Sequence, residues 1–164
     1  MLDSIALPSS VLEALGRLAW FAMNLEDWTN AVCEKVLGEF DTHHPIGRHI
    51  DSAVAELRTW DQTAATVGAV AWLLEAKSGM IRRNQVVHAV PVHMVELLES
   101  GQELEPALVY FHRPPKSGER PQPTFTVLNE KTLDNIADSI EETLTGYVAA
   151  FTAISAAKAV RDGG

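Results

Sequence analysis

Residues 81–88 read IRRNQVVH and bring two arginines, an asparagine and a histidine into one short stretch. An arginine guanidinium can grip a phosphate through two parallel hydrogen bonds, and a histidine near neutrality can act as a general acid or base. Together, Arg83 and His88 could cleave RNA without a metal ion. His88 would assist attack by the 2′-hydroxyl or protonate the leaving oxygen, while Arg83 would stabilise charge on the pentacoordinate phosphate.

The predicted helix that carries this stretch decides how its side chains can meet. It spans about 64–89, because the residue before Pro91 avoids helical geometry. At about 100° per residue, Asn84 and His88 lie about 40° apart on the helix, one turn from each other, and can touch. Arg83 and His88 lie about 140° apart. A site that uses both must lie over the helix end or be completed by a second copy of the chain.

The distribution of charge restricts where a polyanion could bind. The formal net charge of the chain is -9, so its surface as a whole should repel nucleic acid and anionic membranes. The window between Glu75 and Glu96 contains no acidic residue and is the most basic part of the chain. The candidates for binding RNA phosphates are basic residues of this window and of a later hairpin tip, namely Lys77, Arg82, Arg113 and Lys116.

Apolar residues three and four positions apart predict long amphipathic helices in the rest of the chain. The predicted helices span 8–37, 46–60, 64–89 and a last long segment that begins near Asn129 and continues past Ile154. Ser9 or Ser10 is expected to cap the first helix, with Glu13 completing a capping box. Four amphipathic helices with short connections favour an antiparallel bundle.

Two β-branched and aromatic segments, 107–113 and 123–128, flank a loop rich in proline and charge, and they predict a β-hairpin. The fold class predicted is therefore mainly α: an antiparallel four- to five-helix bundle with a small β-hairpin insert, about 107–128, before the last long helix. A length of 164 residues predicts one domain over 1–164.

Composition restricts the setting of the protein. The single cysteine, Cys33, excludes an internal disulfide framework and suits a reducing cytosol. The N-terminal residues MLDSIALPSS lack the features of a signal peptide, and we expect a cytoplasmic protein that does not enter a membrane. No glycine-rich phosphate loop and no set of metal ligands at the usual spacing occurs, so neither a cofactor nor a metal is predicted.

The motif and the order of the predicted elements resemble the HEPN superfamily. Its signature is an arginine, four to six residues and a histidine, with a polar residue often following the arginine. The matching residues are Arg83-Asn84-Gln85-Val86-Val87-His88. The resemblance covers most of the chain as an arrangement of helices, but only these few residues as a motif.

This resemblance implies an all-α bundle that forms a homodimer. Many HEPN domains are metal-independent endoribonucleases in toxin–antitoxin, phage-defence or RNA-processing systems, and the arginine and histidine of two protomers meet in one cleft. Carried over, Arg83 and His88 become the catalytic pair, and Asn84 a supporting polar residue that orients His88 or binds phosphate. RNA and an antitoxin or other protein are the partners implied. One toxin subgroup, which pairs with a nucleotidyltransferase-like antitoxin, has a tyrosine where this chain has Val90.

Two other interpretations make different structural predictions. A non-catalytic HEPN-like module would bind RNA, nucleotide or a partner protein in an open basic cleft. A purely structural helical dimer would bury His88 with its nitrogens satisfied and pair Arg83 with a carboxylate. The nuclease hypothesis instead predicts that Arg83 and His88 of both copies are exposed around one shared cleft.

Overall fold

The computed structural model describes residues 6–38, 44–92, 107–112 and 125–163. The described chain is mainly helical and includes a small three-stranded antiparallel sheet, which confirms the mainly α class. The helices are α1 (Ser9–Leu37), α2 (Ile46–Leu57), α3 (Ala64–Val87), α4 (Glu130–Thr145) and α5 (Tyr147–Asp162). The strands are β1 (Val90–Val92), β2 (Ala107–Phe111) and β3 (Phe125–Leu128).

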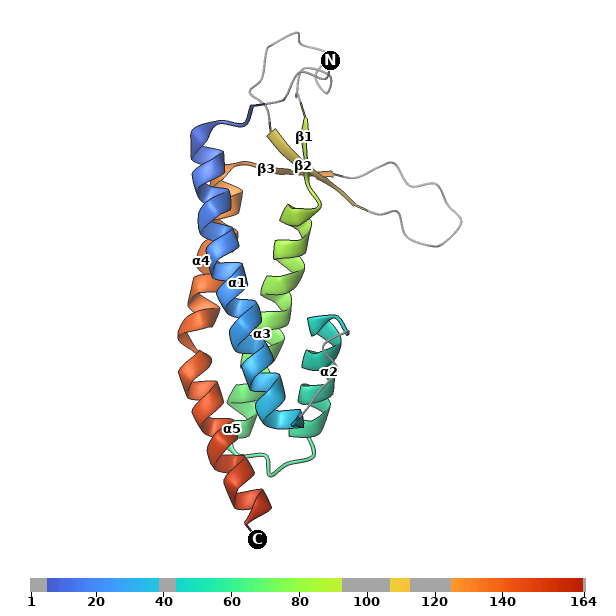
Figure 1. Ribbon diagram of the computed structural model, residues 1–164, viewed down its shortest axis with the longest axis vertical. Coiled ribbons are helices and arrows are strands. Elements are labelled where there is room, and N and C mark those ends of the chain that lie inside the picture. The colour runs from blue at the N-terminus through green and yellow to red at the C-terminus, as the bar shows by residue number, and fades with distance from the viewer. Residues whose placement is uncertain (1–5, 39–43, 93–106, 113–124, 164) are drawn as a thin grey trace, which may run out of the picture.

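The long helices pack side by side around one hydrophobic core (Figure 1). α1 and α3 run in opposite directions, and α4 and α5 follow each other along a single column beside them. The short α2 lies against α1 and α3 near the end of the bundle opposite the sheet. The sheet covers the end where α1 begins and α3 ends, so it lies directly above the IRRNQVVH stretch.

The starts of the helices show which capping predictions hold. Asn129 caps α4 as its side chain accepts a hydrogen bond from the backbone N–H of Thr132 at 2.9 Å, at the place where the sequence predicted this helix to begin. The predicted serine cap of α1 is wrong. Pro8 is the N-cap residue without a side-chain bond, and its carbonyl accepts from the N–H of Leu12 at 3.1 Å. Ser9 is therefore already the first helical residue.

The predicted hairpin strands pair with each other, and a third strand joins them. β2 pairs with β3 in antiparallel register, with Phe111 opposite Phe125. β1, which the sequence did not predict, pairs with the other side of β2 and places Pro91 opposite Leu108. Because β1 is an edge strand, the missing N–H of Pro91 is tolerated there. The chain thus turns from α3 into the sheet within three residues.

The predicted last helix is divided in two at Gly146. The indole Nε1 of Trp72, on α3, donates a hydrogen bond to the carbonyl of Thr143 at 2.7 Å. A Cβ on Gly146 would lie 2.9 Å from Cδ1 of Trp72. The large ring of Trp72 therefore occupies the space that a side chain at position 146 would need. This contact, invisible in the helical spacing of the sequence, ties α3 to the junction of α4 and α5.

Candidate functional site

Arg83 lies on the side of α3 that faces α1. Its Nη2 donates a hydrogen bond to Oε2 of Glu26 in an ion pair, and its side chain is 25% exposed. Gly79, one turn earlier on α3, lets the two helices approach closely, since a Cβ there would be 3.0 Å from Cδ2 of Leu25. The close approach of α1 and α3 thus brings Glu26 within reach of the Arg83 guanidinium.

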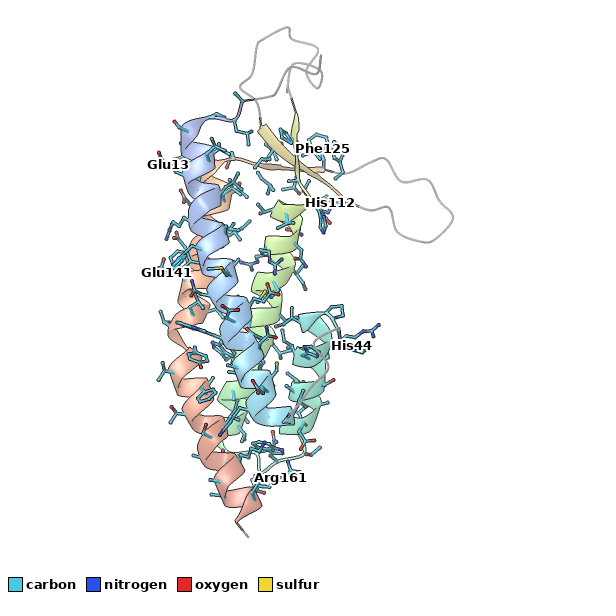
Figure 2. The ribbon with its side chains drawn as sticks, in the orientation of Figure 1. Glu13, His44, His112, Phe125, Glu141 and Arg161 are labelled. Carbon is cyan, nitrogen blue, oxygen red and sulfur yellow. The ribbon has the colours of Figure 1, made fainter. Side chains whose placement is uncertain are left out.

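His88 and Asn84 lie at the end of α3 and are exposed. His88 is the C-cap residue, and its backbone N–H donates to the carbonyl of Asn84 at 3.1 Å. Because the two residues are one turn apart, their side chains leave the helix on nearly the same side. The helix end therefore presents an imidazole and an amide to solvent. Figure 2 shows the surrounding side chains, including His112 at the edge of the sheet near this helix end.

The other basic candidates do not converge on His88 within one chain. Arg82 donates to Oγ of Ser139 on α4 at 3.0 Å, and Lys77 pairs with Asp51 on α2 at 2.5 Å. Arg82 also lines a cavity of about 280 Å³, and the lining includes two acidic residues, Glu75 and Glu142, whose charge opposes phosphate binding there. Successive residues of a helix point about 100° apart, so Arg82 points toward α4 whereas Lys77 points toward α2.

Arg113 and Lys116 lie outside the residues that the structure describes. Among those that it describes, no group of three or more histidine, cysteine, aspartate or glutamate side chains could hold a metal ion. Burial raises the pKa of the Cys33 thiol to about 12, so this thiol stays protonated and is unsuited to nucleophilic chemistry.

The motif agrees in part with two of the three sequence hypotheses. His88 is exposed, as the nuclease hypothesis expects, and it is not the buried histidine of a purely structural helix end. Arg83 is paired to a carboxylate, as the structural hypothesis expects. Glu26 was not predicted as its partner, because it is one of 22 acidic residues and lies 57 positions away in the chain. Only the packing of α1 on α3 relates the two.

Exposed apolar side chains lie beside the motif. Since α1 and α3 are antiparallel, the residue one turn before Glu26 and the residue one turn after Arg83 lie at the same level, nearer the sheet. These residues are Met23 and Val87, which are 52% and 62% exposed. We call Met23, Val87, Arg83, Asn84 and His88 the motif face. It combines unburied apolar groups with the candidate catalytic groups.

Comparison with known proteins adds no assignment to this geometry. No family model, no curated protein and no solved structure matches the chain. The function must therefore be inferred from the residues of the motif face and from the way in which the fold presents them.

Proposed function

We propose that this chain is a metal-independent endoribonuclease of HEPN type that works as a homodimer. In this proposal the helices form the four- to five-helix bundle of that superfamily, and the protein serves in the cytoplasm as a toxin or phage-defence component. The observation that carries the proposal is the exposed His88 at the end of α3, with Asn84 one turn before it and unburied apolar groups beside it.

The chemistry follows from the side chains of the motif face. A neutral His88 accepts the proton of an RNA 2′-hydroxyl as the hydroxyl attacks the adjacent phosphorus, and a protonated His88 donates to the leaving 5′-oxygen. Asn84 can orient the imidazole or bind a phosphate oxygen. The Arg83 guanidinium stabilises the extra negative charge on the pentacoordinate phosphate. Glu26 holds this guanidinium against α1, and phosphate oxygens would replace the carboxylate when RNA binds.

A second chain is needed because one helix separates the two catalytic groups. Arg83 and His88 point about 140° apart, so neither can easily reach a phosphate held by the other. Packing the motif faces of two chains together would cover Met23 and Val87 and bring the His88 of each chain toward the Arg83 of its partner. Both steps of the proton transfer then have a histidine available, one from each chain.

A non-catalytic module of the same fold is the second candidate. It is favoured by one observation: the charge of Arg83 is already neutralised by Glu26, and the side chain is only 25% exposed. A guanidinium held in this way stabilises the packing of α1 on α3. Such a protein would bind RNA, nucleotide or a protein partner without cleaving RNA.

The direct test is cleavage of an unstructured, fluorescently labelled RNA in excess EDTA. The proposal expects cleavage by the wild type and a loss of at least about 100-fold in His88→Ala. His44→Ala, which removes an exposed histidine just before α2, is the matched control and should cleave like the wild type. If the wild type binds RNA but does not cleave it, the nuclease proposal is wrong and the non-catalytic module is the better explanation.

Mixing two inactive variants tests the shared cleft. Arg83→Ala and His88→Ala should each be inactive alone, but subunit exchange yields mixed dimers that contain one intact arginine and one intact histidine on opposite chains. We expect part of the activity to return on mixing. If the mixture stays as inactive as its components while each variant still dimerises, the two groups do not act across two chains.

A further inference from the structure

A groove runs between the first half of α3 and α5, away from the sheet end of α3 at which His88 lies. Two cavities of about 480 Å³ and 390 Å³ lie along it, and they share Ala65 and Ala153, so they form one continuous depression. Its walls are mostly small side chains, among them Ala65, Gly68 and Ala71 on α3 and Ala149, Ala153 and Ala156 on α5. We call this depression the α3–α5 groove.

Large apolar side chains stand exposed beside the groove. Val67 and Leu74 on α3 are 51% and 44% exposed, and Val148 and Val160 on α5 are 67% and 75% exposed. The most apolar stretch within Glu130–Asp162 is only 22% buried, although this run is long and apolar enough, by length and composition, to cross a membrane. Exposed apolar surface of this extent is typical of an interaction site.

Gly68 supports an approach by another backbone. It lies in the second turn of α3, where glycine is less favourable than alanine. A Cβ added to Gly68 would meet no heavy atom within 4 Å, so packing within the chain does not require a glycine there. The missing side chain instead keeps the groove deep. This contrasts with Gly79 and Gly146, where neighbouring side chains already fill the space.

We call Val67 and Leu74 the apolar ridge. The spacing of this ridge and of the two cavities points to a second copy of this chain as the occupant of the α3–α5 groove. Val67 and Leu74 are seven residues apart, which is about 10 Å along a helix. The two cavities contact residues 146–153 and 153–161 of α5, whose midpoints are also about 10 Å apart. The apolar ridge of one chain therefore fits the two hollows of another, as an isologous interface requires.

The size of the face is also that of an interface. α5 has 16 residues and is about 24 Å long, and two adjacent helices are roughly 20 Å across. Their common face thus projects to about 500 Å², and its accessible area is larger because side chains stand out from it. Specific interfaces bury about 600–1,000 Å² per partner. We propose that the α3–α5 groove is a self-association surface that binds the same surface of a second chain.

This surface is independent of the proposed catalytic cleft. Arg83 points about 180° from Leu74 on α3. His88 points only about 40° from Leu74, but it lies about 21 Å further along the helix, so a partner on the α3–α5 groove leaves the motif face open. A chain that uses both surfaces forms a closed tetramer when the two two-fold axes meet at right angles. Each surface can therefore be removed without the other.

A membrane is the competing occupant, and the shape of the face disfavours it. Membrane-surface helices present a convex apolar face bordered by lysine and arginine, whereas this face is concave and lined by alanine. The charged residues that line the two cavities are Asp61, Glu75 and Arg161, which is not a basic border. The net charge of -9 also opposes anionic lipid.

Molar mass by light scattering tests the proposal. The chain has a mass of 17.9 kDa, and the wild type is expected at a multiple of it. Leu74→Glu and Gly68→Trp, which charge the ridge and fill the groove, should each halve the mass. Leu12→Glu charges a leucine on α1 that is 53% exposed, more than Leu74, and should leave the mass unchanged. Circular dichroism checks that every variant is folded.

Two results would overturn the proposal: a monomeric wild type, or an unchanged mass in both groove variants. A monomeric wild type that floats with phosphatidylcholine vesicles while Leu74→Glu does not would identify a membrane as the occupant instead. The proposed nuclease fails separately. If the groove variants halve the mass but no RNA is cleaved in EDTA, only the nuclease falls. If RNA is cleaved but only Met23→Glu with Val87→Glu lowers the mass, only the groove proposal falls.

Discussion

The two ends of α3 are held in opposite ways. Hydrogen bonds anchor its first half, which we call the closed end although Val67 and Leu74 are exposed there: Thr63 caps it by accepting a hydrogen bond from the N–H of Thr66 at 3.2 Å, and Trp72 is buried with its indole bonded to Thr143. Its last turn is open, since Asn84 and His88 are exposed and Val87 is 62% exposed. One helix therefore anchors the bundle at one end and presents polar groups at the other.

This difference teaches where stability and chemistry reside in the molecule. Loss of a buried, hydrogen-bonded side chain costs far more free energy of unfolding than loss of an exposed one. The exposed imidazole of His88 contributes little to the free energy of unfolding. Stability therefore does not explain why a histidine occupies this position. If the two ends of α3 differ in this way, substitutions at each end should change stability by different amounts.

The largest effect is expected at the closed end. Trp72→Ala removes a buried ring and leaves the Thr143 carbonyl without its donor, so the free energy of unfolding should fall by about 3–5 kcal/mol. Val87→Ala at the open end should change it by less than about 0.5 kcal/mol. Urea denaturation measures both. Similar losses in the two variants would abolish the contrast between the ends.

Gly146→Ala should have the next largest effect. The new Cβ would lie 2.9 Å from the Trp72 ring, so the ring or the α4–α5 junction must move, at a cost of about 1–3 kcal/mol. Gly68→Ala is the matched control, because its Cβ has open space; unfolding free energy of the monomer should stay level or rise by up to about 1 kcal/mol. A loss of the same size in both variants would contradict the role given to Trp72.

A smaller change in stability is expected for the ion pair that joins α1 to the open end. Glu26→Gln removes the negative charge opposite Arg83, and because both side chains are partly exposed the loss should be about 0.5–1 kcal/mol. Asp27→Asn, at the exposed neighbouring position, should stay within about 0.5 kcal/mol. The melting curves of both variants provide the measurement.

The same variant separates the two candidate functions. In the nuclease, Glu26→Gln removes the carboxylate that phosphate oxygens must displace from Arg83, so RNA affinity should rise and cleavage in EDTA should persist. In the non-catalytic module, release of the guanidinium should strengthen RNA binding and no cleavage should appear. Unchanged rate and affinity would show that Glu26 serves neither function.

The smallest effect concerns pH at the far end of the bundle. The hydrogen bond from Arg161, at 2.5 Å, is the main reason that the pKa of Glu56 lies below its ordinary value of 4.5. A lowered pKa means that Glu56 stabilises the fold above pH 4.5 and that this contribution is lost as the pH falls through the pKa of the folded state. The difference in melting temperature between wild type and Glu56→Gln should therefore shrink between pH 6 and pH 3. In an Arg161→Ala background the difference should be small at every pH.

Local patterns were sufficient to predict most elements. The three- and four-residue apolar spacing predicted the helical segments, and the asparagine at position 129 marked the start of α4, because capping and helix periodicity depend on residues a few positions apart. Turn-rich sequence between two β-branched segments likewise predicted the pairing of β2 with β3. The angle between Arg83 and His88 also follows from helix geometry alone.

Tertiary structure decided the features that depend on residues far apart in the chain. The sequence around Val90 carries no sign that β2 is available to pair with it, and only the folded chain makes β1. The break at Gly146 depends on Trp72, and the partner of Arg83 depends on the packing of α1 against α3 at Gly79. Local spacing therefore determined the helices and the motif, whereas burial, helix contacts and ion pairing determined the surroundings in which the motif can act.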